Sequence, residues 1–246
     1  MEWRGEGMIT AVRKHGETAA IVEVLTRDHG RHAGVVHGGA SRKQAPVLQA
    51  GNQVEVEWRA RLEEHLGTFR VELLTSRTNI MADRRALAAL SSVCALVGFA
   101  VPERMELPQV YEDTLALIED LAAGADWLSH YVHWEMQMLE HLGYGLDLGR
   151  CAATGVSTDL VYVSPKSGCA VSRNGAGDYR DRMLPLPAFL RDGTHASGGL
   201  AEVLDGLRMT GYFWENWVAP ALGNRPLPAA RDRFVGGLHK GLKRGE

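Results

Sequence analysis

The sequence has 246 residues, of which 45% are hydrophobic and 23% are charged, so it can form one large or two modest globular domains. Its formal net charge of −3 excludes nucleic-acid binding over the whole surface, so any such site must be local. No apolar run reaches the ~18–20 residues that span a bilayer, and the N-terminus lacks the basic start and apolar core of a signal peptide. Three scattered cysteines also exclude a disulfide framework, and we expect a cytoplasmic protein.

Residues 1–79 carry the pattern of short β-strands. An apolar run, a turn at Asp28-His29-Gly30 and a second run predict a β-hairpin, and further along Val54, Val56 and Trp58 alternate with charged residues. A turn is predicted at Glu63–Gly67 before the last strand. The predicted strands are 7–13, 18–26, 32–37, 54–62 and 68–73. Five short strands in this length favour a small barrel of the OB-fold type, with an SH3-like or a plain structural barrel as alternatives.

After residue 79 the periodicity becomes helical. The predicted helices cover 83–97, 108–123, 126–143 and 199–218, with a last one after Pro228 and with Asp126 as the N-cap of the third. Irregular chain lies between the third and fourth helices, with a short strand at 160–163. The fold class is therefore α+β, with a β-barrel domain at 1–79 and a helical domain at 80–246. The helical domain contains an irregular insert at about 147–185.

The insert has the layout of a zinc ribbon without its ligands. A structural zinc site needs four cysteine or histidine ligands in closely spaced pairs. Here the four positions hold Cys151, Thr154, Ser172 and Gly175, and Cys169 is three residues too early for the second pair. We therefore predict that the insert binds no zinc and that Cys151 is a small buried residue.

No motif in the sequence predicts catalysis. His133, Gln137 and His141 share one helix face, but their spacing is not that of H-E-x-x-H, and we interpret them, with Glu135, as solvated helix side chains. The stretch after His37 is similar to an esterase oxyanion loop, but G-x-S-x-G is missing. Dinucleotide-binding and Walker motifs are missing too.

The basic residues are the strongest functional signal, although cations on a solvated face are the simpler alternative. They gather on the predicted hairpin and the loop after it, on the polar face of the fourth strand, and near the C-terminus. Such patches bind phosphates without reading bases. Trp58 is in phase with apolar neighbours and is expected in the core rather than in a base-stacking platform. The candidate DNA-binding residues are Arg27, Arg31, His37, Arg42, Lys43, Arg59, Arg61, Arg231, Arg233 and Lys240.

Four stretches give the sequence a family resemblance. They are GMITAVRKHGETAAIVEVLTRDHGRHAGVVHGGASR, LQAGNQVEVEWRARLEEHLGTFRVEL, HLGYGLDLGRCAATG and DLVYVSPKSGCAVSR. In this order they resemble the RecO family of DNA repair proteins, in the form found in alphaproteobacteria. The resemblance implies an N-terminal OB domain and a C-terminal helical domain with a zinc-finger-like insert. Many relatives hold zinc there with four cysteines, of which this chain matches only Cys151.

The same resemblance implies a function. The family binds single- and double-stranded DNA and anneals complementary strands. It acts with RecR, and sometimes RecF, to help RecA displace single-strand-binding protein. We therefore expect the protein to associate with the nucleoid. Two other classes stay open from the residues alone. One is an OB-fold adaptor that binds RNA or the ribosome, and the other is a small-molecule or metal-dependent enzyme built on the helical domain.

Overall fold

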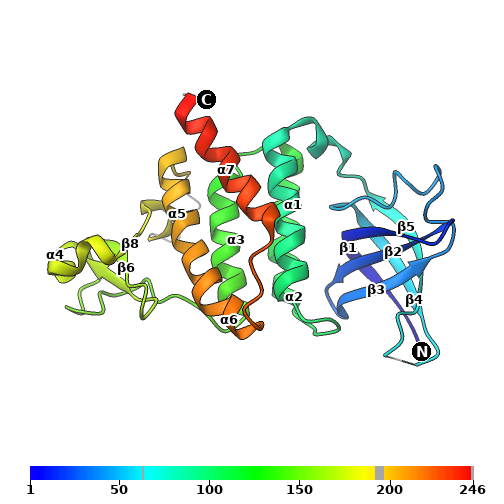
Figure 1. Ribbon diagram of the computed structural model, residues 1–246, viewed down its shortest axis with the longest axis horizontal. Helices are drawn as coiled ribbons and strands as arrows, with labels where there is room; N and C mark the ends of the chain where they lie inside the picture. The colour runs from blue at the N-terminus through cyan, green and yellow to red at the C-terminus, as the bar shows by residue number, and fades with distance from the viewer. Residues whose placement is uncertain (63, 192–196, 245–246) are drawn as a thin grey trace. The chain divides into compact units, whose positions relative to one another are not determined.

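The computed structural model describes residues 1–62, 64–191 and 197–244. The chain divides into two compact units, Met1–Gly124 and Ala125–Glu246. Figure 1 shows a strand-rich first part and a mainly helical second part. The α+β class is confirmed.

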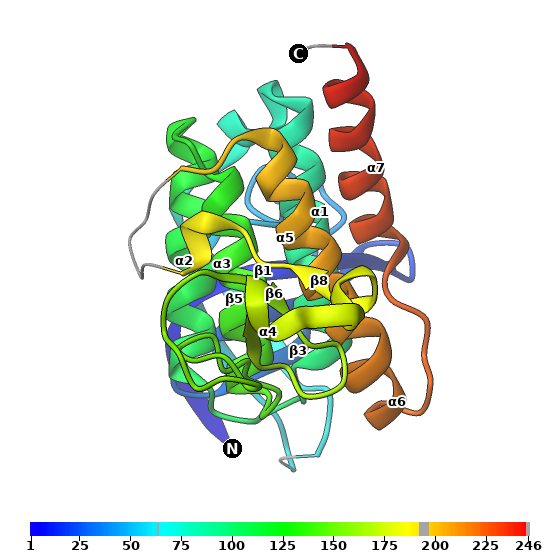
Figure 2. The ribbon, with the colours of Figure 1, turned by 90° about the vertical axis from the view of Figure 1, so that its left-hand side faces the viewer.

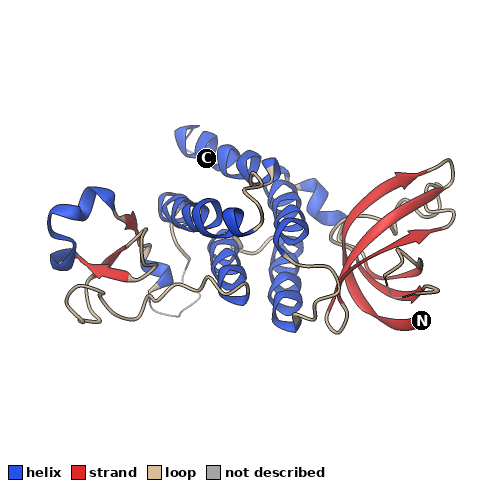
Figure 3. Cartoon of the chain, turned by 60° about the horizontal axis from the view of Figure 1, so that its bottom comes forward, coloured by secondary structure: helices blue, strands red, loops and turns tan. Residues whose placement is uncertain are grey.

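The first unit is built on a closed five-stranded barrel (Figures 1 and 3). Neighbouring strands follow the order β1-β2-β3-β5-β4, and β4 pairs with β1 to close the ring. All pairs are antiparallel except β3 with β5, where Val35 meets Thr68. This arrangement confirms the OB-fold. The strands are β1 (Glu2–His15), β2 (Ala19–Thr26), β3 (Gly30–Val36), β4 (Gln53–Arg59) and β5 (Thr68–Thr75).

Alternation along the strands fills the barrel with apolar side chains. Val54, Val56 and Trp58 of β4 are at most 1% exposed, and the charged residues between them lie on the outside. The Trp58 indole donates to the Leu66 carbonyl at 3.2 Å, which gives its buried N–H a partner. Trp58 is therefore a core residue, as expected. The predicted turn before β5 includes Glu63, which lies outside the described residues.

β1 is twice as long as the sequence pattern predicted, because it pairs with two different strands along its length. Its first half pairs with β4, from Glu2 opposite Arg59 to Met8 opposite Gln53. Its second half pairs with β2, and a register shift after Ile9 bends the strand between the two. Before Met8 the first half has one large apolar residue, Trp3, and glycines at the other inward positions, Gly5 and Gly7, so the sequence pattern there was too weak to predict a strand.

Two helices of the first unit pack beside the barrel, α1 (Arg84–Ala100) and α2 (Pro108–Ala123). The Asp83 carboxylate caps α1 by accepting from two backbone N–H groups, and Gly124 ends α2 with a φ of 66°. Polar contacts join α2 to the barrel: Arg27 pairs with Glu112 at 2.8 Å. These helices belong to the same compact unit as the barrel, and that unit ends at Gly124.

The second unit contains the remaining long helices, α3 (Leu128–His141), α5 (Leu200–Phe213) and α7 (Ala229–Arg244). α3 packs against α5, which continues through a π-helical turn at Trp214–Val218 into α6 (Ala219–Ala221) (Figure 1). The predicted N-cap Asp126 is wrong. Trp127 holds that position, and its indole has no acceptor that could cap the helix. Its ring is buried against Phe234, with 6.1 Å between the ring centroids.

The insert forms a small sheet with β6 (Leu160–Val163) between β7 (Ala170–Ser172) and β8 (Leu184–Pro185). The single-turn helix α4 (Arg173–Ala176) follows β7 directly in the sequence and contacts β6, beside which Figure 2 shows it. Among the described residues, no helix is both long enough and apolar enough to cross a bilayer.

Candidate nucleic-acid interface

The loop after β3, residues 37–44, is named here the cationic loop. Gly38 turns the chain with a φ of 70°, a conformation that favours glycine. The loop is then held to the start of β2, since the Ala40 N–H donates to the Thr18 carbonyl at 3.0 Å. Arg42 and Lys43 lie on this loop, are exposed, and form no ion pair with any residue that the structure describes. Both charges are available to an anionic ligand.

A groove of about 620 Å³ runs between the cationic loop and the outer face of β4 and β5. It brings together His37, Lys43 and Arg59, three of the residues predicted to bind DNA, and adds Arg70 of β5. Glu57 and Glu72 also line the groove. We name this hollow the β4–β5 groove.

The two arginines of the groove wall, Arg59 and Arg70, already pair with neighbouring carboxylates. Arg59 pairs with Glu2 at 2.9 Å and also with Glu57, and its pKa is raised by the hydrogen bond to Glu2 first and then by the two negative charges. Arg70 pairs with Glu72 at 3.3 Å. Exposed pairs of this kind are weak because water screens the charges, so a phosphate can compete for the guanidinium groups. Arg61, just past β4, is exposed.

Two cations predicted for DNA binding, Arg27 and Arg31, form contacts between the barrel and its helices. The Arg31 side chain is 12% exposed, pairs with Glu23 at 2.9 Å, and donates to the Val101 carbonyl at 3.0 Å. Arg27 is engaged by Glu112, as described above. Arg31 is too buried to reach a backbone phosphate from this position, and we leave it out of the proposed interface. The Arg27 side chain is 56% exposed, so, like Arg59, it stays a predicted DNA contact.

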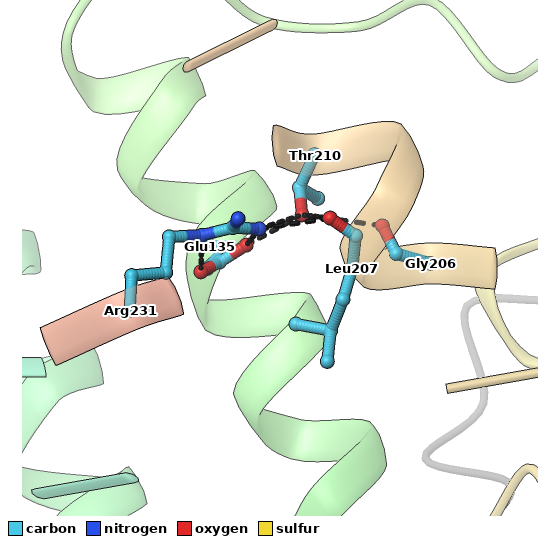
Figure 4. A network of polar contacts seen from close by, with 5 residues as sticks. All are labelled: Glu135, Gly206, Leu207, Thr210 and Arg231. Carbon is cyan, nitrogen blue, oxygen red and sulfur yellow. Dashed lines mark hydrogen bonds and ion pairs between the residues drawn. The ribbon is translucent and has the colours of Figure 1, made fainter. Parts of the chain in front are cut away.

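Arg231 is also unavailable, because it lies inside the second unit (Figure 4). Its Nε and Nη2 donate to the two oxygens of Glu135 at 2.7 and 2.8 Å, and Nη2 also donates to the Leu207 carbonyl at 2.8 Å. Burial acts to lower the Arg231 pKa, but the Glu135 carboxylate outweighs it and raises the pKa. Arg231 is 5% exposed and Glu135 is 0% exposed, so the predictions that one binds DNA and the other is solvated are wrong.

The sequence held a signal for this burial. Arg231 is spaced three and seven residues before Phe234 and Leu238, the buried residues of α7. This spacing places all three on one helix face. Arg233 and Lys240 are exposed and seven residues apart, so they share a different face of α7.

Sequence reasoning gave little weight to Arg70 and missed Lys14. Lys14 of β1 is exposed and lies opposite Ala20, which in turn lies opposite Val36 at the start of the cationic loop. Only the strand register brings Lys14 to the same end of the sheet as the loop. No periodicity in the sequence could have shown this.

The helix-face histidines predicted to be solvated are half-buried. The His133 ring packs edge-on against Phe189 with 5.6 Å between centroids. Gln137 and His141 are also half-buried on the same helix. Within the described ranges, no cluster of three histidine, cysteine or acidic side chains is arranged to hold a metal ion.

The four zinc-ribbon positions of the insert do lie together, but hydrogen bonds join them. The backbone N–H and the hydroxyl of Ser172 both donate to the Cys151 sulfur, at 3.2 and 3.3 Å. The Thr154 hydroxyl lies 3.5 Å from that of Ser172, and a Cβ at Gly175 would lie 2.7 Å from the sulfur. One thiol, two hydroxyls and a glycine do not fit zinc. Burial opposes ionisation of Cys151, yet these donors lower its pKa to about 6.

We expect elemental analysis of the purified protein to find far less than one zinc per chain. Hydrogen bonds already join the positions where a zinc ribbon has its ligands, and only Cys151 supplies a zinc-binding atom. A chelator should leave the thermal midpoint unchanged. About one zinc per chain, retained through dialysis, would show that other side chains have replaced the missing ligands.

The strand order and the insert define an OB-fold protein with a helical unit that carries a zinc-ribbon-like module. Two family descriptions match the chain in succession, "Recombination protein O N terminal" over residues 1–77 and "Recombination protein O C terminal" over residues 81–226. The chain therefore belongs to the RecO family, as the resemblance indicated.

Curated relatives agree over nearly the full length. A protein of Ruegeria sp. (strain TM1040) is 53% identical over 97% of this chain and 98% of its own length. One from Dinoroseobacter shibae is 52% identical over 96% and 97%, and one from Jannaschia sp. (strain CCS1) is 49% identical over 100% and 99%. Each of these relatives is named DNA repair protein RecO.

Proposed function

We propose that this chain is a non-catalytic DNA repair mediator that binds DNA through the cationic loop and the β4–β5 groove, and anneals complementary strands. The observation that carries the proposal is the pair of exposed, unpaired cations, Arg42 and Lys43, beside a groove lined by further cations. The names of its relatives support a role in DNA repair.

The chemistry of this surface suits annealing. Annealing requires that two phosphate backbones approach each other while the base edges stay free to pair. Lysine and arginine on an outer surface supply charge to the backbone without engaging the bases. A deep groove that stacked many successive bases would hinder pairing.

A second cationic surface, on α7, could hold a second DNA strand. Arg233 and Lys240 are exposed on one face of α7, and neither forms an ion pair with another described residue. We propose that the loop and groove hold one strand and that these two cations hold the other. The partners proposed from the family are RecR and RecF, single-strand-binding protein and, indirectly, RecA.

The test is to replace Arg233 and Lys240 together with alanine, and to measure single-strand binding and annealing separately. Both side chains are exposed, so the fold should be retained. We expect unchanged affinity for a labelled single strand and slower annealing of complementary oligonucleotides. Unchanged annealing would leave the barrel as the sole DNA site.

Binding assays on the wild-type protein distinguish the DNA repair function from the alternative, an RNA-binding adaptor. DNA binding and annealing without turnover of any nucleotide are expected. If structured RNA competes far better than single-stranded DNA, an RNA-binding adaptor is the better description and the repair function fails.

A further inference from the structure

A second cavity of the barrel differs in character from the β4–β5 groove. It has a volume of about 340 Å³, within the size range of small-ligand sites. Aromatic side chains dominate its wall. The lining residues are Met1, Glu2, Trp3, His29, His32, Trp58, Arg104 and Glu106. We name this cavity the aromatic pocket.

The rings of the pocket form a stacked cluster with an accessible outer part. Trp3 stacks on His29 with 4.1 Å between centroids and 22° between planes, and lies parallel to Trp58 at 6.0 Å. Trp58 and His32 are buried, whereas Trp3 and His29 are half-buried. The partly accessible pair, Trp3 and His29, therefore offers aromatic surface to a ligand in the cavity.

Arg104 is held at the pocket by a costly backbone conformation. Its φ of 61° lies in the left-handed region, which costs a residue with a side chain of the order of 1–3 kcal/mol. Its N–H donates to the Arg31 carbonyl at 2.9 Å and its Nη2 to the His65 carbonyl at 2.9 Å. The guanidinium consequently lies 5.9 Å from the centre of the Trp58 ring. Such conformations persist where the surroundings fix them, and they are concentrated at functional sites.

The charges of the pocket favour a neutral ring over a phosphate. The carboxylates of Glu2 and Glu106 offset the Arg104 guanidinium and the N-terminal ammonium, which is itself bound to the Ala60 carbonyl at 2.7 Å. A phosphate would gain little there. A planar group with N–H donors could stack on Trp3 or His29 and donate to a carboxylate, and nucleobases have this combination.

The pocket and the groove are neighbours on the barrel. Glu2 lines the aromatic pocket, Arg59 lines the β4–β5 groove, and the two residues form an ion pair at 2.9 Å. A strand whose backbone follows the groove would therefore pass within reach of the pocket.

We propose that the aromatic pocket receives one unstacked base of a single DNA strand whose phosphates lie in the β4–β5 groove. This inference rests on the proposed function. In a duplex the bases are stacked and paired, so the pocket gives a preference for single strands. One captured base leaves its neighbours free to pair, which is compatible with annealing.

The experiment compares a single-stranded oligonucleotide with an abasic strand of the same length, which has the same phosphates and no bases. We expect the wild-type chain to bind the normal strand about 5- to 100-fold more tightly, from the range of base–aromatic stacking. Trp3→Ala should remove this preference and leave the affinity for the abasic strand unchanged. Trp3→Phe keeps a ring and should retain part of the preference, and circular dichroism checks that both variants fold.

His29→Ala keeps the result interpretable if Trp3→Ala fails to fold, since His29 comes from a turn. It too should reduce the preference. Equal wild-type affinity for the normal and the abasic strand would overturn this inference and leave the proposed function intact. If the wild-type chain binds neither strand, the proposed function itself is wrong. Trp3-dependent binding of deoxycytidine monophosphate, with no difference between the two strands, would mean that the pocket takes a free nucleotide, which also overturns the inference.

Discussion

Replacing Arg231 with alanine is expected to lower the free energy of unfolding by about 3–5 kcal/mol, the range for breaking a buried ion pair by removing one partner. Arg231 and Glu135 are at most 5% exposed. The substitution would leave the Glu135 carboxylate buried without its guanidinium, and would also leave the Leu207 carbonyl without that donor. Urea denaturation followed through the second unit's tryptophans measures the change.

A matched control and a double variant separate the charge effect from simple truncation. Arg233→Ala removes the same side-chain type two residues along α7, but from an exposed position, and should stay within about 0.5 kcal/mol of wild type. Glu135→Leu with Arg231→Met replaces both charges by apolar groups, and should recover most of the loss because neither charge is left unpaired.

A cost below about 1 kcal/mol for Arg231→Ala would contradict this account. Arg231 would then reach solvent in the folded protein, and its candidacy as a DNA contact would be restored. The same result would require a different partner for the Glu135 carboxylate.

Replacing Arg42 and Lys43 together with alanine is expected to weaken single-strand binding about 5- to 30-fold at low salt. Each exposed contact with a phosphate should contribute roughly 0.5–1 kcal/mol. The loop backbone is held by its own hydrogen bonds, and neither side chain has an ion-pair partner among the described residues, so stability should be unchanged. Fluorescence anisotropy with a labelled oligonucleotide provides the measurement.

The control for this pair is Arg150→Ala with Lys166→Ala. These residues also comprise one arginine and one lysine, both exposed, but they lie in the insert. Equal losses in the two double variants would show that only overall charge matters. A loss confined to the loop variant would support a local site.

The sequence predicted the elements whose periodicity is set by one buried face. β4 alternates cleanly, and α2 begins at Pro108 and ends before Gly124, as its start and stop signals indicated. The first half of β1 was missed because its inward positions hold one aromatic residue, Trp3, followed by two glycines, and its pairing with β4 is a long-range contact. The packing of α1 and α2 beside the barrel could not be predicted from the sequence either, because it depends on long-range contacts such as that of Arg27 with Glu112.

The candidate site was only partly predictable for a related reason. Composition identifies cations, but tertiary packing decides which remain available. Arg42 and Lys43 follow two glycines on a polar loop and are exposed, whereas Arg31 and Arg231 find carboxylates inside their units. The aromatic pocket could not be read from the chain, because strand pairing brings Trp3 beside Trp58 and the hairpin turn adds His29.

The central claim is that the cationic loop binds the DNA backbone, and the salt dependence of single-strand affinity tests it most directly. Each phosphate contact contributes about 0.7 to the slope of log K against log salt for single strands. The slope of the Arg42→Ala, Lys43→Ala variant should therefore be smaller than that of wild type by about 1.4, while the insert control keeps the wild-type slope. Identical slopes for wild type and the loop variant would contradict the account and move the DNA site away from this loop.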